Sequence, residues 1–164
     1  IPFIVHIPKS LEISHKRGEL REELVELRDV FPTILNASNI PIPSEMDGKS
    51  ILAIYRKKTW RKTLDLEHSQ VYEPDNAWTA ITDGKYKYIY YTLTGSEQLF
   101  FVKKDPFELT ELVKVLGKNH KKVNKYRNLM IEHLRERGTD WVQNDQLVIQ
   151  KKSYDHSKNF PSEN

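Results

Sequence analysis

An Asp83-Gly84 dipeptide between two runs of strand-forming residues constrains the fold of this chain more than any other feature. The flanking runs, residues 77–82 and 85–91, are rich in threonine, isoleucine and aromatic side chains, which favour strands. Asp-Gly accommodates the positive φ angles that a tight hairpin turn requires. The sequence therefore predicts a β-hairpin closed at Asp83-Gly84.

The second strand of this hairpin predicts which face of the sheet is buried. Successive side chains of a strand point to opposite faces. One face therefore carries Tyr86, Tyr88 and Tyr90. The other face carries Lys85, Lys87 and Ile89. A second turn at residues 94–96 precedes another apolar run at residues 98–102, so we expect a three-stranded antiparallel meander.

A helix should cover this sheet. Val123, Tyr126, Met130 and Leu134 form an apolar stripe at helical spacing, and Gly138 can end the helix. Residues 147–149 read as a final strand, which would bring the sheet to about four strands.

The N-terminal part shows a different pattern. The apolar run at residues 3–7, closed by Pro8, predicts a strand buried on both faces. Asp29 is placed to cap a helix that contains Pro32 in its first turn and ends near Ser38. A strand and a helix followed by a meander and its covering helix indicate an α+β fold.

Composition excludes several classes of site. The 164 residues contain no cysteine, which rules out disulfides, thiolate metal sites and a cysteine nucleophile. The net charge of +3 comes from basic and acidic residues interspersed along the chain, so we expect no nucleic-acid partner. No run of about 18 apolar residues predicts a membrane span. The abrupt apolar start without Met suggests that Ile1 lies inside a longer protein.

Four segments then match one family in order. Residues 26–52 contain Val-Phe-Pro-Thr-Ile-Leu, Ile-Pro-Ile-Pro and Asp-Gly-Lys-Ser-Ile-Leu, similar to V-D-L-x-P-T-L-L, A-G-I and D-G-x-S-L. Residues 81–89 resemble R-T-G-x-Y-K-Y-I, and residues 95–112 resemble G-x-E-E-L-Y-D-L followed by D-P-x-E-x-x-N-L. The opening residues resemble V-P-x-I-x-x-x-P. Together they identify the chain as resembling the C-terminal portion of a sulfatase of the arylsulfatase family, within the alkaline-phosphatase-like superfamily.

The resemblance implies a domain organisation. Residues 1–60 would be the terminal piece of an α/β catalytic domain, including the predicted opening strand and helix. Residues 61–150 would be the C-terminal sulfatase subdomain, an antiparallel sheet of about four strands with a long helix packed on it. Residues 151–164 read as a flexible tail.

It also implies a function for the longer protein. A sulfuric ester hydrolase of this family uses a formylglycine, made from the first residue of C/S-x-P-x-R, and a divalent cation such as calcium. Neither form of the motif occurs in this sequence, so the fragment alone should be inactive. Its expected partners are the upstream catalytic domain and a sulfated small molecule or carbohydrate. It would complete the rim of the substrate pocket and stabilise the catalytic domain.

Two alternatives stay open. A related phosphatase, phosphonate hydrolase or phosphotransferase would differ in its upstream nucleophile, and a free-standing carbohydrate-binding module would use the aromatic sheet. An extracytoplasmic or a cytoplasmic location would suit these residues equally well.

The residues expected to reach a substrate lie just before the hairpin. His68 and Glu67 offer an imidazole and a carboxylate, which suit substrate recognition or proton transfer. Neighbours in a strand point to opposite faces, so the two should not form a dyad. Trp78 and Trp60 can each stack on a sugar or aryl group, although large aromatic side chains are more often core or interface anchors. No metal ligand is expected in this chain.

Overall fold

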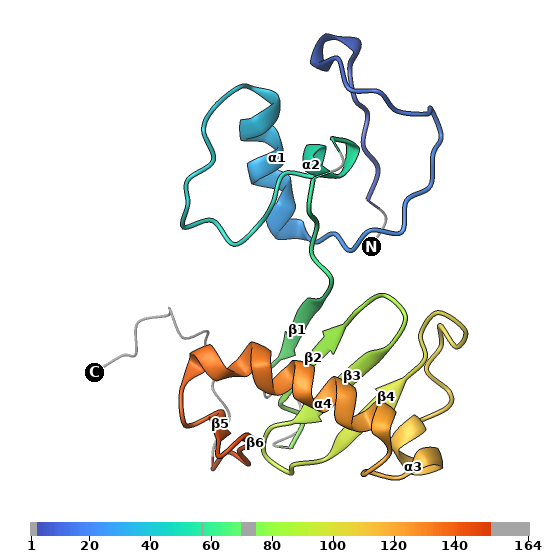
Figure 1. Cartoon of the computed structure of the whole chain (residues 1–164), viewed down its shortest axis with the longest axis vertical. Helices are drawn as coiled ribbons and strands as arrows, with labels where there is room; N and C mark the ends of the chain where they lie inside the picture. The colour runs from blue at the N-terminus through green and yellow to red at the C-terminus, as the bar shows by residue number, and fades with distance from the viewer. Residues whose placement is uncertain (1–2, 57, 70–74, 152–164) are drawn as a thin grey trace. The chain divides into compact units, whose positions relative to one another are not determined.

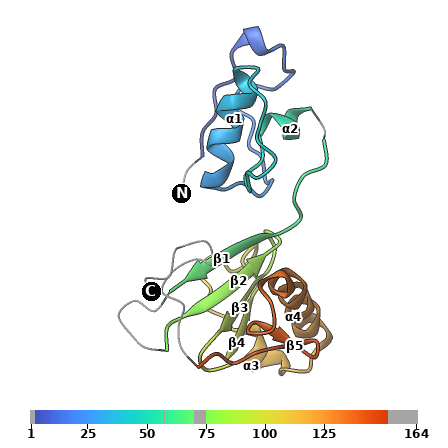
Figure 2. The same ribbon diagram turned by 90° about the vertical axis from the view of Figure 1, so that its left-hand side faces the viewer.

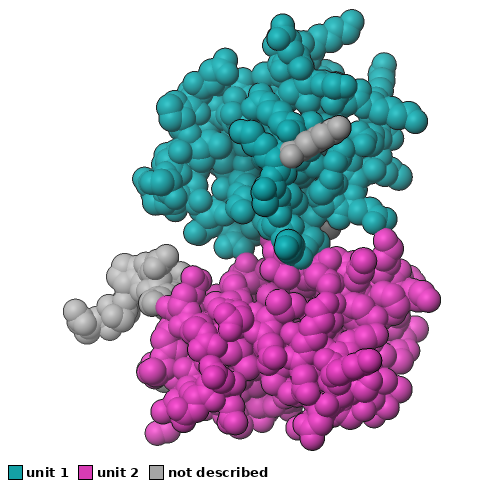
Figure 3. All heavy atoms as spheres, viewed as in Figure 1, with its two compact units in different colours: residues 1–62 teal, residues 63–164 magenta. Residues whose placement is uncertain are grey.

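The computed structural model describes residues 3–56, 58–69 and 75–151. The chain divides into two compact units, residues 1–62 and 63–164, which are coloured separately in Figure 3. The predicted tail lies outside the described residues except for Lys151. Within the described ranges, no helix combines the length and the apolar character needed to cross a bilayer.

The second unit is built on a four-stranded antiparallel sheet in the order β1-β2-β3-β4 (Figure 1). The strands are β1 (Leu64–His68), β2 (Trp78–Thr82), β3 (Lys87–Tyr91) and β4 (Glu97–Phe100). The predicted meander corresponds to β2, β3 and β4. The fourth strand is β1, in a stretch where extended chain was considered at Glu67 and His68 but no strand bounds were predicted.

The turn between β2 and β3 is wider than predicted. It comprises residues 83–86, and among these Gly84 has a positive φ of 78° while Asp83 does not. The Asp83 carboxylate instead accepts the backbone N–H groups of Lys85 and Tyr86, at 2.9 and 2.8 Å. The aspartate thus shapes the turn through its side chain, and the glycine through its backbone.

The helix α4 (Lys121–Leu134) packs on one face of the sheet, as Figure 2 shows, and α3 (Leu112–Leu116) lies near β4. The predicted apolar stripe of α4 is buried, and the helix continues as η3 (Arg135–Arg137) to Gly138. The predicted α+β class, with its sheet and covering helix, is confirmed. The core on this face comprises Ile81, Tyr88, Tyr90, Leu99, Val113, Val123, Tyr126, Met130, Ile131, Leu134 and Val142.

The opposite face of the sheet carries a smaller apolar cluster. Its buried members are Ala80, Ile89 and Phe100, from β2, β3 and β4. Trp78, Tyr91 and Val102 pack against them.

The predicted final strand does not join this sheet. β5 (Val142–Gln143) and β6 (Gln146–Leu147) form a separate two-stranded hairpin, so the prediction of a strand at residues 147–149 was wrong in extent and pairing. Beyond β6 the backbone N–H of Gln150 donates to the carbonyl of Thr92 at 2.8 Å, next to the end of β3. The chain returns to the sheet as an irregular segment.

The first unit contains short helices: η1 (Lys9–Leu11), η2 (Leu27–Asp29), α1 (Val30–Ala37) and α2 (Leu52–Tyr55). The predicted helix corresponds to α1. The predicted opening strand is not formed, and Ile4 is 92% exposed. A strand needs a neighbour for its backbone hydrogen bonds, and no described strand of this unit supplies one.

Asp29 does not cap α1 as predicted, because its own φ and ψ, −78° and −16°, are already helical. Its buried carboxylate accepts the backbone N–H groups of Glu26 and Lys49, at 2.9 and 2.8 Å, and two guanidinium N–H groups of Arg61 at 2.5 Å. Burial alone would raise the pKa of Asp29, but these donors outweigh it and lower the pKa. The Asp29 carboxylate therefore links three segments of the first unit, at Glu26, Lys49 and Arg61.

Candidate functional site

His68 and Trp78 form a stacked pair at the ends of β1 and β2. They are directly opposite in the antiparallel register, and cross-strand neighbours share a face of the sheet. Their ring centroids are 5.5 Å apart, and the ring planes differ by 19°. The structure thus brings together two of the three residues predicted to reach a substrate.

A backbone carbonyl orients the imidazole. The Nδ1 atom of His68 lies 3.1 Å from the carbonyl oxygen of Asn76. A carbonyl can only accept, so Nδ1 must carry the hydrogen, and in the neutral ring Nε2 is then the acceptor. The arrangement gives the half-buried imidazole a fixed donor and a fixed acceptor end. No feature of the sequence pointed to Asn76 in this role.

Glu67 lies on the other face of β1. Its carboxylate forms an ion pair with Arg137 of η3, and the Arg137 guanidinium lies 4.9 Å from the ring centroid of Trp141. Glu67 and His68 therefore do not form a dyad, as the strand geometry predicted. Arg137 is 70 residues away in the sequence, so no local pattern could have identified it as the partner of Glu67.

Trp60 and the two lysines of the hairpin also have structural roles or positions. The indole N–H of Trp60 donates to the carbonyl of Leu24 at 2.8 Å, which anchors it within the first unit. Lys87 forms an ion pair with Glu108. Lys85 lies in the turn before β3 and not in the strand, so it does not extend a row of strand lysines with Lys87.

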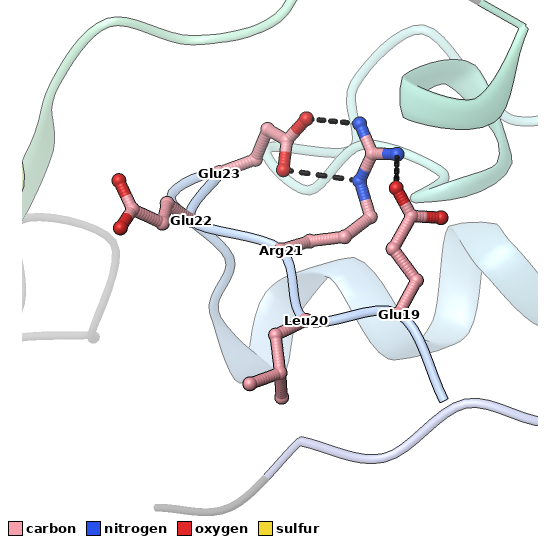
Figure 4. Close-up of a pocket in the computed structure, with 5 residues that line it drawn as sticks. All are labelled: Glu19, Leu20, Arg21, Glu22 and Glu23. Atoms are coloured by element: carbon pink, nitrogen blue, oxygen red, sulfur yellow. Dashed lines mark hydrogen bonds and ion pairs between the residues drawn. The ribbon is translucent and has the colours of Figure 1, made fainter. Parts of the chain in front are cut away.

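A surface hollow in the first unit is lined by five consecutive residues, 19–23, drawn in Figure 4. Arg21 lies between two carboxylates: it bonds to Glu19 at 3.0 Å and to both oxygens of Glu23. The hydrogen bond from Arg21 lowers the pKa of Glu23. The arginine charge is thus matched locally, and the hollow contains none of the predicted site residues.

Metal-binding geometry is not found in the described ranges. Across residues 3–56, 58–69 and 75–151, no three histidine or carboxylate side chains converge as a cation site requires. The described residues therefore do not fit a calcium ion. The sequence also has Pro74 between His68 and the hairpin, where we expect a proline to hold an open loop, but Pro74 lies outside the described residues.

Most of the chain matches a protein-family model. Residues 1–137 match the family described as N-sulphoglucosamine sulphohydrolase, C-terminal. The match covers both units up to the end of η3.

Three relatives agree with this match. An arylsulfatase of Clostridium perfringens is 32% identical over 151 residues, which cover 90% of this chain and 30% of the relative. A Delta 4,5-hexuronate-2-O-sulfatase of Bacteroides thetaiotaomicron is 28% identical over 64% of this chain and 21% of its own length. A solved structure of a 2-O GAG sulfatase matches with a TM-score of 0.55 and 25% identity, over 66% of this chain and 24% of that one. The chain thus spans less than a third of the length of each.

Proposed function

Because this chain belongs to the family of N-sulphoglucosamine sulphohydrolase C-terminal regions, we propose that it is the C-terminal part of a sulfuric ester hydrolase. In the longer protein it completes the rim of the substrate pocket and stabilises the catalytic domain. The family match over residues 1–137 is the observation that carries this proposal. The names of the relatives, an arylsulfatase and a hexuronate sulfatase, favour a sulfated aryl or carbohydrate substrate.

The catalytic groups would come from another part of the protein. A formylglycine and a divalent cation, calcium in this proposal, would supply the nucleophile and the charge stabilisation for sulfate transfer. The sequence contains no C/S-x-P-x-R motif, and the described residues do not fit the cation. This chain therefore takes no part in steps at those groups, and its own contribution is binding and orientation.

His68 and Trp78 are the proposed contacts to the substrate. Stacking on Trp78 helps to hold the imidazole, and the Nε2 atom of His68 can accept a hydrogen bond from a hydroxyl or donate one to a sulfate oxygen when protonated. A site that pairs with a substrate hydroxyl discriminates strongly against analogues without it. Glu67 is also a proposed substrate contact, but it would bind a substrate only if its ion pair with Arg137 were broken.

The substitution His68→Ala in the longer protein tests this role. We expect kcat/KM for a sulfated oligosaccharide to fall about tenfold or more, because one buried hydrogen bond is lost. Turnover of a small aryl sulfate should change little, since it lacks the distal groups that His68 would contact. Steady-state kinetics with both substrates measure the difference.

His15→Ala is the matched control. The Nδ1 atom of His15 also lies near a backbone carbonyl, that of Ile13 at 2.9 Å, and its ring contacts Tyr55 edge-on. It should leave both activities unchanged. If His68→Ala lowers the melting temperature but leaves the oligosaccharide kinetics intact, the histidine is structural. If the longer protein cleaves a phosphonate ester and no sulfate ester, the proposed reaction is wrong.

A further inference from the structure

A stacked aromatic pair on the helix side of the second unit is in contact with two lysines. The rings of Tyr86 and Phe101 are nearly parallel, 9° apart, with centroids at 4.4 Å. The ammonium of Lys122 donates to the Tyr86 hydroxyl at 2.8 Å and lies 4.7 Å from the ring centroid. The ammonium of Lys104 lies 5.7 Å from the centroid of Phe101. Rings thus position both cations, since the faces of aromatic rings attract them.

A third lysine sits on the neighbouring ring. The centroid of Tyr126 is 5.3 Å from that of Tyr86, and the Lys125 ammonium is 4.9 Å from the Tyr126 centroid. Lys85 follows in the turn, directly before Tyr86, and is exposed. We call Lys85, Lys104, Lys122 and Lys125 the lysine cluster.

The ammonium groups of the lysine cluster are not neutralised by the carboxylates near them. Among the residues that the structure describes, no carboxylate forms an ion pair with any of the four lysines. The carboxylate of Asp83 is committed to the Tyr126 hydroxyl, at 2.7 Å, and to two backbone N–H groups of its turn. Lys85, Lys104 and Lys125 are exposed, and Lys122 is half-buried. Asp83 attracts Lys125 electrostatically, but none of the four described lysines is ion-paired, so the surface stays positive.

We propose that the lysine cluster is a docking surface for an extended sulfated polysaccharide, distinct from the His68–Trp78 pair. Several closely spaced cations attract a polyanion more strongly than a single sulfate ester, because each bound cation releases counter-ions from the polymer. The surface would hold a polymeric substrate while one sulfate is cleaved elsewhere. This inference rests on the proposed function.

The covered rings favour a sulfated polysaccharide over a nucleic acid. Phe101 and Lys122 cover Tyr86, and Lys125 covers Tyr126, which removes the platforms on which bases stack.

The test uses the 164-residue chain and heparin as the polysulfated probe. A variant with Lys85, Lys104, Lys122 and Lys125 all changed to Gln should bind heparin at least about tenfold more weakly at 0.1 M salt and elute from a heparin column at lower salt. A fourfold Lys→Arg variant at the same positions should retain binding. Circular dichroism verifies that both variants fold.

A charge-matched control separates local from overall charge. Changing Lys9, Lys16, Lys49 and Lys62, four exposed lysines of the first unit, to Gln removes the same charge. This control should bind heparin as the unchanged chain does. Equal weakening by both fourfold Gln variants would overturn the proposal. So would tighter binding to duplex DNA or to phosphatidylserine vesicles than to heparin.

Catalysis distinguishes this inference from the proposed function. In the longer protein, the fourfold Gln variant should keep turnover of a small aryl sulfate and lose kcat/KM on a sulfated polymer. An inactive longer protein whose isolated chain still binds heparin through the lysine cluster would contradict the reaction and retain the surface. An active enzyme whose variant binds heparin normally would contradict the surface alone.

Discussion

The two units of the chain are stabilised in different ways. The second unit buries an eleven-residue apolar cluster between α4 and its sheet. The first unit has its longest helix over the eight residues of α1, and the buried ion pair of Asp29 and Arg61 links segments 32 residues apart. Among the described residues nine large apolar side chains of the first unit are exposed, including Ile4, Leu20 and Phe31, against six in the longer second unit, including Phe107 and Leu109. Apolar packing dominates the second unit, and the buried Asp29–Arg61 ion pair with its hydrogen bonds dominates the first.

This difference fits the proposed domain organisation. A unit that exposes leucine and isoleucine side chains has apolar surface suited to contact with another protein surface. We propose that residues 1–60 are the terminal piece of the α/β catalytic domain, which would cover that surface in the longer protein. Residues 61–150 would form the subdomain with its own core.

The largest effect should follow from Asp29→Ala. The substitution removes the closer of two carboxylates that pair with the Arg61 guanidinium, which is only 9% exposed, and leaves Glu26 at 3.4 Å. Removing one partner of a buried ion pair costs about 3–5 kcal/mol, so the first unit should lose its protection against hydrogen exchange while β2, β3 and α4 keep theirs. Mass spectrometry of exchanged peptides measures both units. The exposed Asp47 gives a control, Asp47→Ala, that should change neither unit. Loss of protection in both units would mean that their stabilities are coupled.

Acid should weaken the first unit through the same residue, with a smaller effect. The pKa of Asp29 is lowered in the folded state, so the carboxylate contributes stability above its unfolded pKa of about 4, and this contribution is lost as the pH falls through the folded value. The pKa of Asp83 in the second unit is lowered too. The Asp83 carboxylate stabilises a local turn, however, and does not link distant segments as Asp29 does. Exchange measured from pH 6 to pH 3 should therefore show the first unit opening earlier. A second unit that opens first would contradict the comparison.

The smallest effect is expected at the β2–β3 turn. Gly84 has a φ of 78°, where a β-branched side chain is strained, so Gly84→Val should destabilise the second unit by about 1 kcal/mol or slightly more. The apolar core should keep the unit folded. A urea melt followed by tryptophan fluorescence measures the change, with Lys85→Val as the control in the same turn. An unchanged midpoint would show that the turn tolerates a side chain there.

The features that sequence predicted are local ones. The hairpin, the tyrosine face of β3 and the apolar stripe of α4 depend on residues within about a dozen positions of each other. By contrast β1 pairs with β2 across an intervening segment, and its alternation of Leu64 and Leu66 with Asp65 and Glu67 is too short to distinguish a strand from a loop. Asp29 resembled a helix cap because the local pattern does not reveal donors 20 and 32 residues away.

For the candidate site, too, the local features were predictable from the sequence and the long-range contacts were not. The residue types at His68, Glu67 and Trp78 indicated recognition chemistry, and strand geometry predicted that the first two would separate. The stacking of His68 on Trp78 depends on the β1–β2 register, which the sequence does not specify without knowledge of β1.

That register also limits how this part of the chain can change in evolution. In an antiparallel pair, the parity of a position decides which face its side chain occupies. A one-residue deletion within β1 would move Glu67 to the face of Trp78 and His68 to the face of α4, exchanging a carboxylate for the imidazole. A length change in the connection between β1 and β2 leaves the parity of both strands intact. Relatives of this protein are therefore expected to vary in length between these strands and to conserve the number of residues within them.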